Sequence, residues 1–248
     1  MIYLASQSPR RRQLLRQIGV PFQLLTGEID ETPQAGEQGK EYVLRMAKQK
    51  AQAAWERVQG QQLTPYPVLT ADTSVVFGET IFGKPENKAH ACDMLKALGG
   101  KTHQVLTAVA MMQGDQFHPV LSTTYVTMMP ISEALAQRYV ATGEADDKAG
   151  AYAIQGMGAA LVVKLEGSYS GTVGLPLQET TMLLEKFNIP LWQQTVSDEA
   201  TVKPEGGGNE NYTSVAPARS LTENSARSED CEKLRIKISA SEDNSEVI

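Results

Sequence analysis

The sequence has little cysteine and little histidine. Its 248 residues include 2 cysteines, Cys92 and Cys231, which lie far apart and belong to no C-x-x-C pair. This pattern argues against a disulfide framework or a zinc site, and it makes a reducing cytoplasm the expected location. The 3 histidines, His90, His103 and His118, stand at no metal-ligand spacing, so we expect structural or surface roles for them.

Net positive charge and long apolar runs are absent as well. The formal net charge is −6 at pH 7, so a phosphate polymer would repel the chain as a whole, and no nucleic acid partner is expected. No run approaches the ~18 apolar residues of a membrane span, so no membrane association is expected. In the opening MIYLASQSPRRR, polar sequence begins too early for the apolar region of a signal peptide.

The composition changes after about Gln193. Residues 195–248 are rich in Ser, Glu, Asn and Gly and contain few large apolar side chains. Such a segment cannot bury enough surface to offset the entropy lost on ordering it. We therefore expect one compact domain over residues 1–193 and a low-complexity, disordered tail over residues 194–248. Weak strand alternation at Leu234, Ile236 and Ile238 leaves a short structured piece open within the tail.

Helical and strand patterns alternate across residues 1–193. The spacing of apolar residues predicts helices over about 8–19, 40–58, 87–98, 132–141 and 177–187. Short apolar runs predict strands over 2–5, 22–26, 68–69, 74–77, 105–112, 120–128 and 159–165. We therefore expect an α/β domain, and the adjacent pair at 105–112 and 120–128 favours a mixed sheet over a purely parallel one.

The stretch SQSPRRR follows a predicted strand and begins a predicted helix. Ser8 is a typical N-cap and Pro9 a typical first helical residue. Free backbone N–H groups, a hydroxyl and the guanidinium groups of Arg10 and Arg11 would then converge where the helix dipole favours an anion. The stretch predicts a phosphate site, with a solvated arginine face as the alternative; we expect Arg12 to be solvated.

The stretch LTADTSVVFGETIFGKP carries a candidate acid and a candidate cation. We expect Asp72 and Thr73 between two short strands, where an acid can face a cleft. Lys84 stands on a restricted turn, and a carboxylate and a lysine beside an anion site suit phosphoryl chemistry. An Asx-capped turn is the alternative for ADT. Lys50, expected on the helix face opposite the alanines, is either solvated or a further cation of the same cleft.

The stretch DDKAGAYAIQGMGAAL places Gln155 among Gly150, Gly156 and Gly158. A side-chain amide both donates and accepts hydrogen bonds, as recognition of a base edge requires. Close approach of the backbone to a flat ligand would explain the glycines, and an ordinary glycine-rich loop is the alternative.

Taken together, these stretches resemble one known family. In order, LASQSPRRRQLL, AKQKA, ADTSV, GKP, GGKTHQVLTAVA, DKAGAYAIQG and GSYSGTVGLPLQET are similar to the Maf family of nucleotide pyrophosphatases, over Ile2 to about Asn188. The resemblance implies an elongated mixed β-sheet flanked by helices, with two lobes around a central cleft, like the inosine-triphosphate pyrophosphatases. It also implies a homodimer. The implied reaction cleaves a nucleoside triphosphate between the α and β phosphates with a divalent metal cation, Mg²⁺ or Mn²⁺.

The resemblance also implies roles for individual residues. Asp72 matches the proton acceptor that activates water, and Glu31 matches an acidic position that joins Asp72 near the metal. Arg10, Thr73 and Gln155 match the positions that separate substrate groups. Their identities are similar to the branch acting on dTTP and UTP, whereas the 7-methyl-GTP branch carries Trp, Gln and Glu there. The phosphate-binding positions are matched by Ser8, Arg11, Lys50 and Lys84.

The leading interpretation is therefore an enzyme that hydrolyses dTTP, UTP and, as an open extension, modified pyrimidine nucleotides. One alternative is a nucleotide-binding regulator of septum formation and cell division without significant turnover, because relatives are linked to septum inhibition. The other is a 7-methyl-GTP pyrophosphatase.

Overall fold

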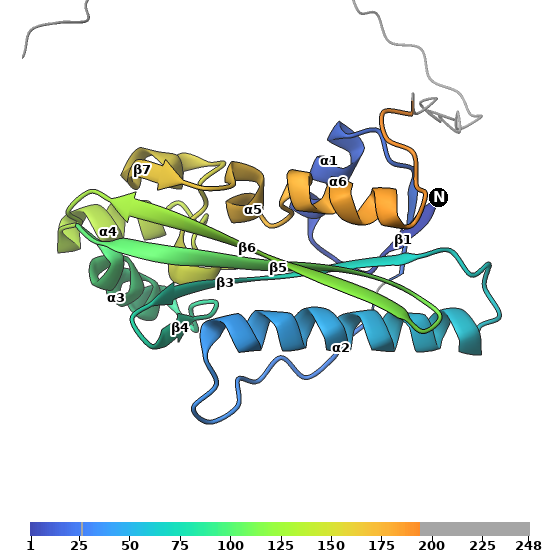
Figure 1. Cartoon of the computed structure of the whole chain (residues 1–248). Helices are drawn as coiled ribbons and strands as arrows, with labels where there is room; N and C mark the ends of the chain where they lie inside the picture. The colour runs from blue at the N-terminus through green and yellow to red at the C-terminus, as the bar shows by residue number, and fades with distance from the viewer. Residues whose placement is uncertain (26, 194–248) are drawn as a thin grey trace, which may run out of the picture. The chain divides into compact units, whose positions relative to one another are not determined.

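The computed structural model of the chain describes residues 1–25 and 27–193 (Figure 1). A seven-stranded mixed sheet has the order β2-β1-β3-β5-β6-β7, and β4 pairs with β3 beside this path. The strands are β1 (Ile2–Leu4), β2 (Phe22–Leu24), β3 (Val68–Phe77), β4 (Thr80–Phe82), β5 (Thr102–Gln113), β6 (Gln116–Met128) and β7 (Val162–Glu166). Strand β1 runs parallel to β2 and β3, and the other pairs are antiparallel. The predicted mixed α/β fold is confirmed.

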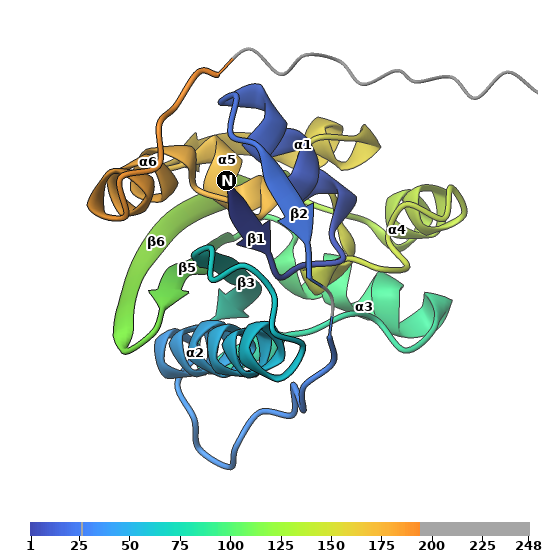
Figure 2. The same ribbon diagram turned by 90° about the vertical axis from the view of Figure 1, so that its right-hand side faces the viewer.

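Helices cover both faces of this sheet (Figures 1 and 2). They are α1 (Pro9–Gln17), α2 (Gly39–Gly60), α3 (Lys88–Leu98), α4 (Glu133–Val140), α5 (Tyr169–Val173) and α6 (Leu177–Lys186), with short 3-10 helices η1 (Ala149–Ala151) and η2 (Met157–Leu161). Helix α2 packs its apolar stripe on β3 and β5, whereas α5 and α6 pack on the opposite face. No helix in the described ranges is both long and apolar enough to cross a membrane.

Two large core clusters lie toward opposite ends of the long strands. One unites α3 and α4 with Val75, Val105 and Val126. The other unites β1, α1, α5 and α6 with Leu69, Val109 and Met111. These clusters correspond to the two predicted lobes, and the middle of β3 lies between them.

The stretch TADT does not interrupt a strand, so that prediction was wrong. Strand β3 is continuous, and its edge toward β5 is paired from Val68 to Val76. Its other edge pairs with β1 only at Val68 and Leu69 and with β4 only at residues 75–77. Within the described residues, positions 70–74 therefore have no strand on that edge, because the chain leaves β1 to form α1. The carboxylate of Asp72 can therefore face a cleft because no strand of the described residues covers this part of the sheet edge.

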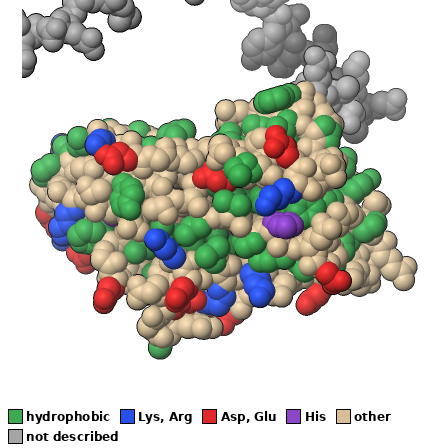
Figure 3. All heavy atoms as spheres, viewed as in Figure 1, with side chains coloured by type: hydrophobic (Ala, Val, Ile, Leu, Met, Phe, Trp, Pro, Cys, Tyr) green, Lys and Arg blue, Asp and Glu red, His purple; other side chains and the backbone are tan. Residues whose placement is uncertain are grey.

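Charged side chains of both signs are dispersed over the face drawn in Figure 3. Lysines and arginines alternate there with aspartates and glutamates, and apolar groups lie between them. A continuous basic stripe, which would be typical of nucleic acid binding, is not seen on that face.

Candidate active site

A cleft of about 890 Å³ opens beside the unpaired edge of β3. It is lined by every site residue that the sequence predicted: Ser8, Arg10, Arg11, Glu31, Lys50, Asp72, Thr73, Lys84 and Gln155. These residues come from the start of α1, the loop before α2, α2 itself, β3, the segment after β4 and the loop before η2. The fold thus gathers into one place residues that are far apart in the sequence.

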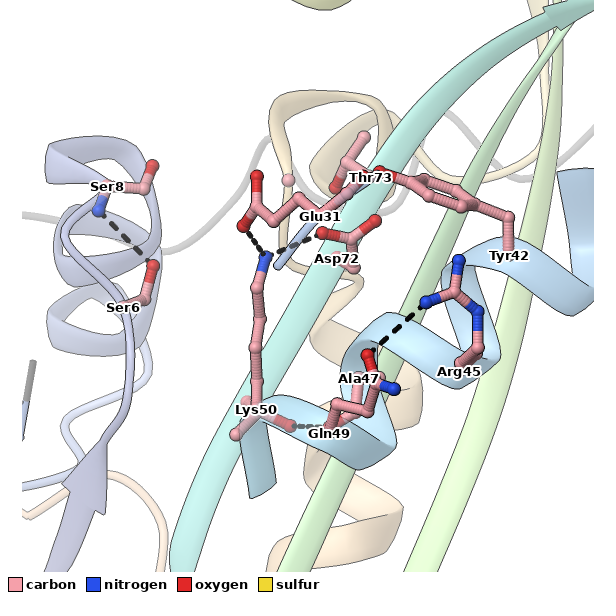
Figure 4. A network of polar contacts seen from close by, with 12 residues as sticks. Ser6, Ser8, Glu31, Tyr42, Arg45, Ala47, Gln49, Lys50, Asp72 and Thr73 are labelled. Carbon is pink, nitrogen blue, oxygen red and sulfur yellow. Dashed lines mark hydrogen bonds and ion pairs between the residues drawn. The ribbon is translucent and has the colours of Figure 1, made fainter. Parts of the chain in front are cut away.

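Lys50 joins two carboxylates at the floor of this cleft (Figure 4). Its Nζ lies 2.7 Å from Oδ1 of Asp72 and 2.6 Å from Oε1 of Glu31. Asp72 is only 7% exposed, so its negative charge needs a partner to offset lost hydration. Oδ2 of Asp72 accepts no hydrogen bond from the residues that the structure describes, which leaves that oxygen available to a ligand or water.

The structure decides between the two interpretations of Lys50. Its side chain is 18% exposed and turned into the cleft, so it is not a solvated surface lysine. The expectation that Lys50 lies opposite the alanines was wrong. Ala47 and Ala54 stand three residues before and four residues after it, and a helix places residues at these spacings on the same side.

Glu31 is held by its side chain and by its backbone. Burial alone would raise the pKa of its carboxyl, but the hydrogen bond from Lys50 and the surrounding positive charges hold that pKa below its usual value. The hydroxyl of Tyr42 donates to the backbone carbonyl of Glu31 at 2.8 Å. Burial, followed by the nearby negative charges, raises the pKa of Tyr42 to about 12, so the hydroxyl keeps its proton.

Glu31 and Asp72 form a donor set that fits a hard divalent cation. Mg²⁺ prefers oxygen ligands and commonly takes one or two carboxylates together with substrate phosphates and water. In the part of the chain described, no group of three or more His, Cys, Asp or Glu is arranged to hold a metal by itself. A cation at this pair would therefore depend on oxygens of the substrate as well.

Arg11 is fastened into the cleft wall. Its Nε donates to the carbonyl of Gly174 at 2.8 Å, and its terminal nitrogens donate to Oγ of Ser6 at 3.2 Å and Oγ1 of Thr73 at 3.3 Å. Burial lowers the pKa of Arg11, and the negative charge of Asp72 opposes that effect. With these donors engaged, Arg11 fixes the wall around Thr73 and adds positive charge to the cleft.

Thr73 belongs to a chain of hydrogen bonds that crosses the sheet. Its Oγ1 lies 3.0 Å from Oγ1 of Thr107 on β5, and Thr107 donates in turn to the carbonyl of Gly171 at 2.8 Å. Because the Thr107 hydroxyl donates its proton to that carbonyl, Thr73 donates to Thr107 and accepts from Arg11. The orientation of the Thr73 hydroxyl is thereby fixed.

The other basic residues differ from Arg11 in their surroundings. The side chains of Arg10 and Lys84 line the cleft, and neither makes a hydrogen bond with the described part of the protein. Their donors are free to bind a ligand. Arg12, expected to be solvated, is half-buried and is not among the described residues that line the cleft.

Ser6 is a residue that the sequence reasoning missed. Ser8 stands at the N-cap as expected, but its side chain makes no capping hydrogen bond. The buried hydroxyl of Ser6 instead accepts from the backbone N–H of Ser8 at 3.2 Å and from Arg11. A polar residue shortly after a buried strand was the available signal. Thr107 and Tyr42, also missed, carry no such signal because they lie within long regular elements.

The glycines beside Gln155 make room for protein side chains. A Cβ on Gly156 would lie 1.8 Å from Oε1 of Glu144, and a Cβ on Gly158 would lie 2.7 Å from the hydroxyl oxygen of Tyr139. The proposed close approach of a flat ligand is therefore not what these two glycines serve. Gln155 itself is exposed and lines the cleft.

Comparison with known proteins identifies the family. A family model described as Maf-like protein matches residues 1–187. This chain belongs to the Maf family. The Maf match ends before the predicted tail, and that tail, residues 194–248, lies outside the described residues.

Relatives of this Maf protein align over almost their whole length. A protein of Pasteurella multocida named dTTP/UTP pyrophosphatase is 48% identical over 194 residues, which cover 77% of this chain and 97% of the relative. One from Alcanivorax borkumensis with the same name is 49% identical, covering 78% and 98%. The solved structure of the Staphylococcus aureus Ham1 protein aligns at 16% identity over 51% of this chain and 71% of its own, with a TM-score of 0.35, too low to carry a conclusion.

Proposed function

We propose that this Maf protein is a nucleoside triphosphate pyrophosphatase that hydrolyses dTTP and UTP to the monophosphate and pyrophosphate. The observation that carries the proposal is the single cleft in which a buried carboxylate, a second carboxylate and several cations meet. The names of the relatives, dTTP/UTP pyrophosphatase, support the same activity and substrates.

Asp72 is the proposed general base. Its Oδ1 is held by Lys50, its Oδ2 has no partner among the described residues, and the residue lines the cleft. A water at Oδ2 would give up its proton to the carboxylate as its oxygen attacks the α–β phosphoanhydride. The ion pair with Lys50 holds the carboxylate in place, so that Oδ2 is oriented to accept the proton.

The triphosphate is proposed to lie among the cations of the cleft. Arg10 and Lys84 have donors that are not used by the described protein, and Lys50 and Arg11 contribute fixed positive charge. Charge on the leaving pyrophosphate is stabilised by such prearranged groups at little cost in reorganisation. Glu31 and Asp72 would hold the divalent cation, which when bound neutralises phosphate charge.

The base is proposed to lie at the end of the cleft formed by residues 152–155. Gln155 offers a neutral amide there, and Tyr152 and Ile154 line the same end with aromatic and aliphatic surface. An amide that donates and accepts can recognise the polar edge of a pyrimidine. Arg10 and Thr73 complete the proposed selection of dTTP and UTP.

Replacing Asp72 by Asn tests the catalytic assignment. D72N keeps the shape of the side chain and removes the base, so we expect pyrophosphate release from dTTP to fall by about 10²–10⁴-fold. Release is measured with Mg²⁺ and with Mn²⁺. D115N, on the exposed turn between β5 and β6, is the matched control and should retain wild-type turnover. Unchanged turnover in D72N would refute the role of Asp72.

A substrate panel separates this proposal from its alternatives. Wild-type protein is given dTTP, UTP, CTP and 7-methyl-GTP, and pyrophosphate is measured. Preference for dTTP and UTP supports the proposal, while preference for 7-methyl-GTP would assign the protein to the other branch. Nucleotide binding without turnover would favour a regulator of cell division.

A homodimer, on the strength of the family resemblance alone, and a cytoplasmic location, expected from the sparse and unpaired cysteines, are also part of the proposal. Sedimentation velocity on the full chain measures the first, and cell fractionation measures the second. A monomer in solution or a chain recovered outside the cytoplasm would correct them without affecting the proposed reaction.

A further inference from the structure

The loop that carries Gln155 connects η1 to η2 along the cleft. The side-chain amide of Gln155 makes no hydrogen bond with the residues that the structure describes, so it is open to a ligand. An exposed amide can tell one base from another only when the backbone beneath it is fixed, because a misplaced donor meets the wrong atom. The groups that fix this backbone therefore bear on substrate choice.

Two side chains behind the loop hold it on both sides of Gln155. The hydroxyl of Tyr139 accepts from the backbone N–H of Ala153 at 3.2 Å and donates to Oε2 of Glu144 at 2.7 Å. The carboxylate of Glu144 accepts from the backbone N–H groups of Met157 at 2.9 Å and Gly158 at 2.8 Å. We name Tyr139 and Glu144 together the loop clamp.

The two glycines of the loop are shaped to the clamp. Gly156 has φ −119°, which any residue can adopt, so its lack of a side chain is not explained by backbone conformation. It is explained by space, since a Cβ there would lie 1.8 Å from Oε1 of Glu144. Gly158 leaves similar room for the hydroxyl of Tyr139. The G-x-G pattern and the clamp are thus complementary parts of one arrangement.

We propose that the loop clamp is the device that sets base selection in this protein, by positioning Gln155 against the pyrimidine edge. The inference rests on the proposed function, and it assigns to Tyr139 and Glu144 a positioning role without contact to the substrate.

The chemistry of Glu144 suits this role. Burial would raise the pKa of its carboxyl, but the hydrogen bonds from Tyr139, Gly158 and Met157 outweigh burial and hold that pKa below its usual value. The carboxylate therefore stays ionised and accepts all three hydrogen bonds at neutral pH. A carboxamide of the same size has one oxygen and an NH₂ group, so it would present a donor to one of the two backbone N–H groups.

E144Q tests the proposal through substrate discrimination. Thymine and cytosine differ at ring positions 3 and 4, where thymine carries a donor and an acceptor and cytosine carries an acceptor and a donor. We expect the ratio of kcat/KM for dTTP to that for CTP to fall by roughly 10- to 100-fold in E144Q. The kcat for dTTP should change by less than about threefold, because Asp72 and the cations are untouched. Y139F should lower the same ratio.

A double-mutant cycle shows whether the clamp acts through Gln155. Q155A alone should lower the dTTP to CTP ratio, and E144Q combined with Q155A should lower it no further. E133Q, which neutralises an exposed carboxylate at the start of α4, paired with Lys96 of α3, is the control and should leave the ratio unchanged. G156A approaches the clamp from the opposite side and should reproduce E144Q even if E144Q folds poorly.

The outcomes distinguish three cases. The clamp's role would be overturned if E144Q and Q155A had independent, multiplicative effects on the ratio. It would also be overturned if E144Q and G156A lowered thermal stability and kcat but left the ratio unchanged. Either result would leave the proposed function standing. If wild-type protein releases no pyrophosphate, the proposed function fails. The clamp is then judged on the dTTP to CTP ratio of dissociation constants in the same variants, where an unchanged ratio would overturn it.

Discussion

The cleft has two walls that use charge in opposite ways. On the charged wall (Glu31, Lys50 and Asp72), ionised groups face the cleft and are linked to one another by ion pairs of 2.6 and 2.7 Å. On the amide wall (residues 152–155), the group that faces the cleft is the neutral Gln155, while the carboxylate of Glu144 lies behind the loop. Both walls depend on a carboxylate, but only one of them presents it to a ligand.

This difference follows from what each wall would have to do. Phosphoryl transfer needs fixed charge where negative charge builds up on phosphate oxygens, and ion pairs hold that charge in place. Selection between two uncharged bases needs hydrogen bonds of fixed direction, which a neutral amide on a fixed backbone can supply. The charged wall therefore presents ionised groups to the cleft, whereas behind the amide wall the carboxylate of Glu144 accepts hydrogen bonds from backbone N–H groups.

The largest effect is expected from breaking the charged wall at its centre. K50M removes the cation between Asp72 and Glu31 and keeps most of the aliphatic side chain. Since one prearranged electrostatic group is commonly worth about 10²–10³ in kcat, we expect a loss of that size for dTTP. The dTTP to CTP ratio of kcat/KM should stay within about threefold of the wild-type value, because the amide wall is intact.

K96M is the matched control for that experiment. Lys96 is also bonded to two carboxylates, Asp93 and Glu133, but this exposed cluster lies on α3 and α4 outside the cleft lining. Turnover in K96M should equal wild type. If K50M and K96M lose the same small amount of activity, then the position of Lys50 in the cleft has no special role and the two-wall comparison fails.

Much of this arrangement could be predicted from the sequence, and the missing parts have a physical reason. Apolar spacing located α2 and α3, and the Ser8-Pro9 pair located the start of α1. The predicted site residues all line one cleft. They could be predicted as a set because the resemblance to the Maf family implied a role for each of them. The continuity of β3 was missed because a polar residue such as Asp72 resembles a break between two strands. Its partner Lys50 lies 22 residues away on a helix, so the sequence shows no local sign of the ion pair.

Contacts between distant segments account for the other misses. The short strand β4 and helix α5 have too few residues to show a period. The glycines at 156 and 158 make room for Glu144 and Tyr139, which are more than ten residues away and give no local signal, and Gly158 also lies against the backbone of Ala153. Local patterns therefore predicted the elements, whereas side-chain pairs across elements had to be seen in three dimensions.

The second prediction concerns how the folding stability of the protein changes at acid pH, through a histidine beneath the amide wall. His103 is 1% exposed beneath this wall, with Nε2 at 2.8 Å from the hydroxyl of Tyr152, and burial lowers the pKa of His103 to about 4. Between pH 6.5 and pH 4 the unfolded chain binds a proton at this residue that the folded chain does not, so folding stability falls as pH falls. The shift corresponds to about 3 kcal/mol over that window.

H103Q should remove that part of the pH dependence. Urea unfolding of wild type and H103Q at several pH values gives the difference in unfolding free energy, and this difference should shift by about 3 kcal/mol in favour of H103Q from pH 7 to pH 4. The carboxylates titrate in both proteins and cancel in the comparison. A difference that is constant with pH would contradict the assignment to His103.

The smallest effect is expected from Y42F, which sharpens the comparison within the charged wall. The hydroxyl of Tyr42 donates to the backbone carbonyl of Glu31, while Arg45 holds the same loop through Glu37 and the carbonyl of Thr32. Loss of the hydroxyl should thus loosen Glu31 without releasing the loop. Because groups that orient metal ligands typically contribute 10–100-fold in affinity, we expect about a tenfold weaker response to metal.

Two measurements check Y42F, and they separate metal binding from catalysis. The Mn²⁺ concentration giving half-maximal pyrophosphate release should rise about tenfold, with kcat at saturating Mn²⁺ within about twofold of wild type. Electron paramagnetic resonance of Mn²⁺ titrated into protein with dTMP and pyrophosphate should show the same weakening without turnover. Y66F, whose ring packs on Tyr3 outside the cleft lining, should match wild type in both. A fall in kcat at saturating metal with unchanged Mn²⁺ affinity would instead place Tyr42 in the alignment of Asp72, whose negative charge also acts on the Tyr42 hydroxyl.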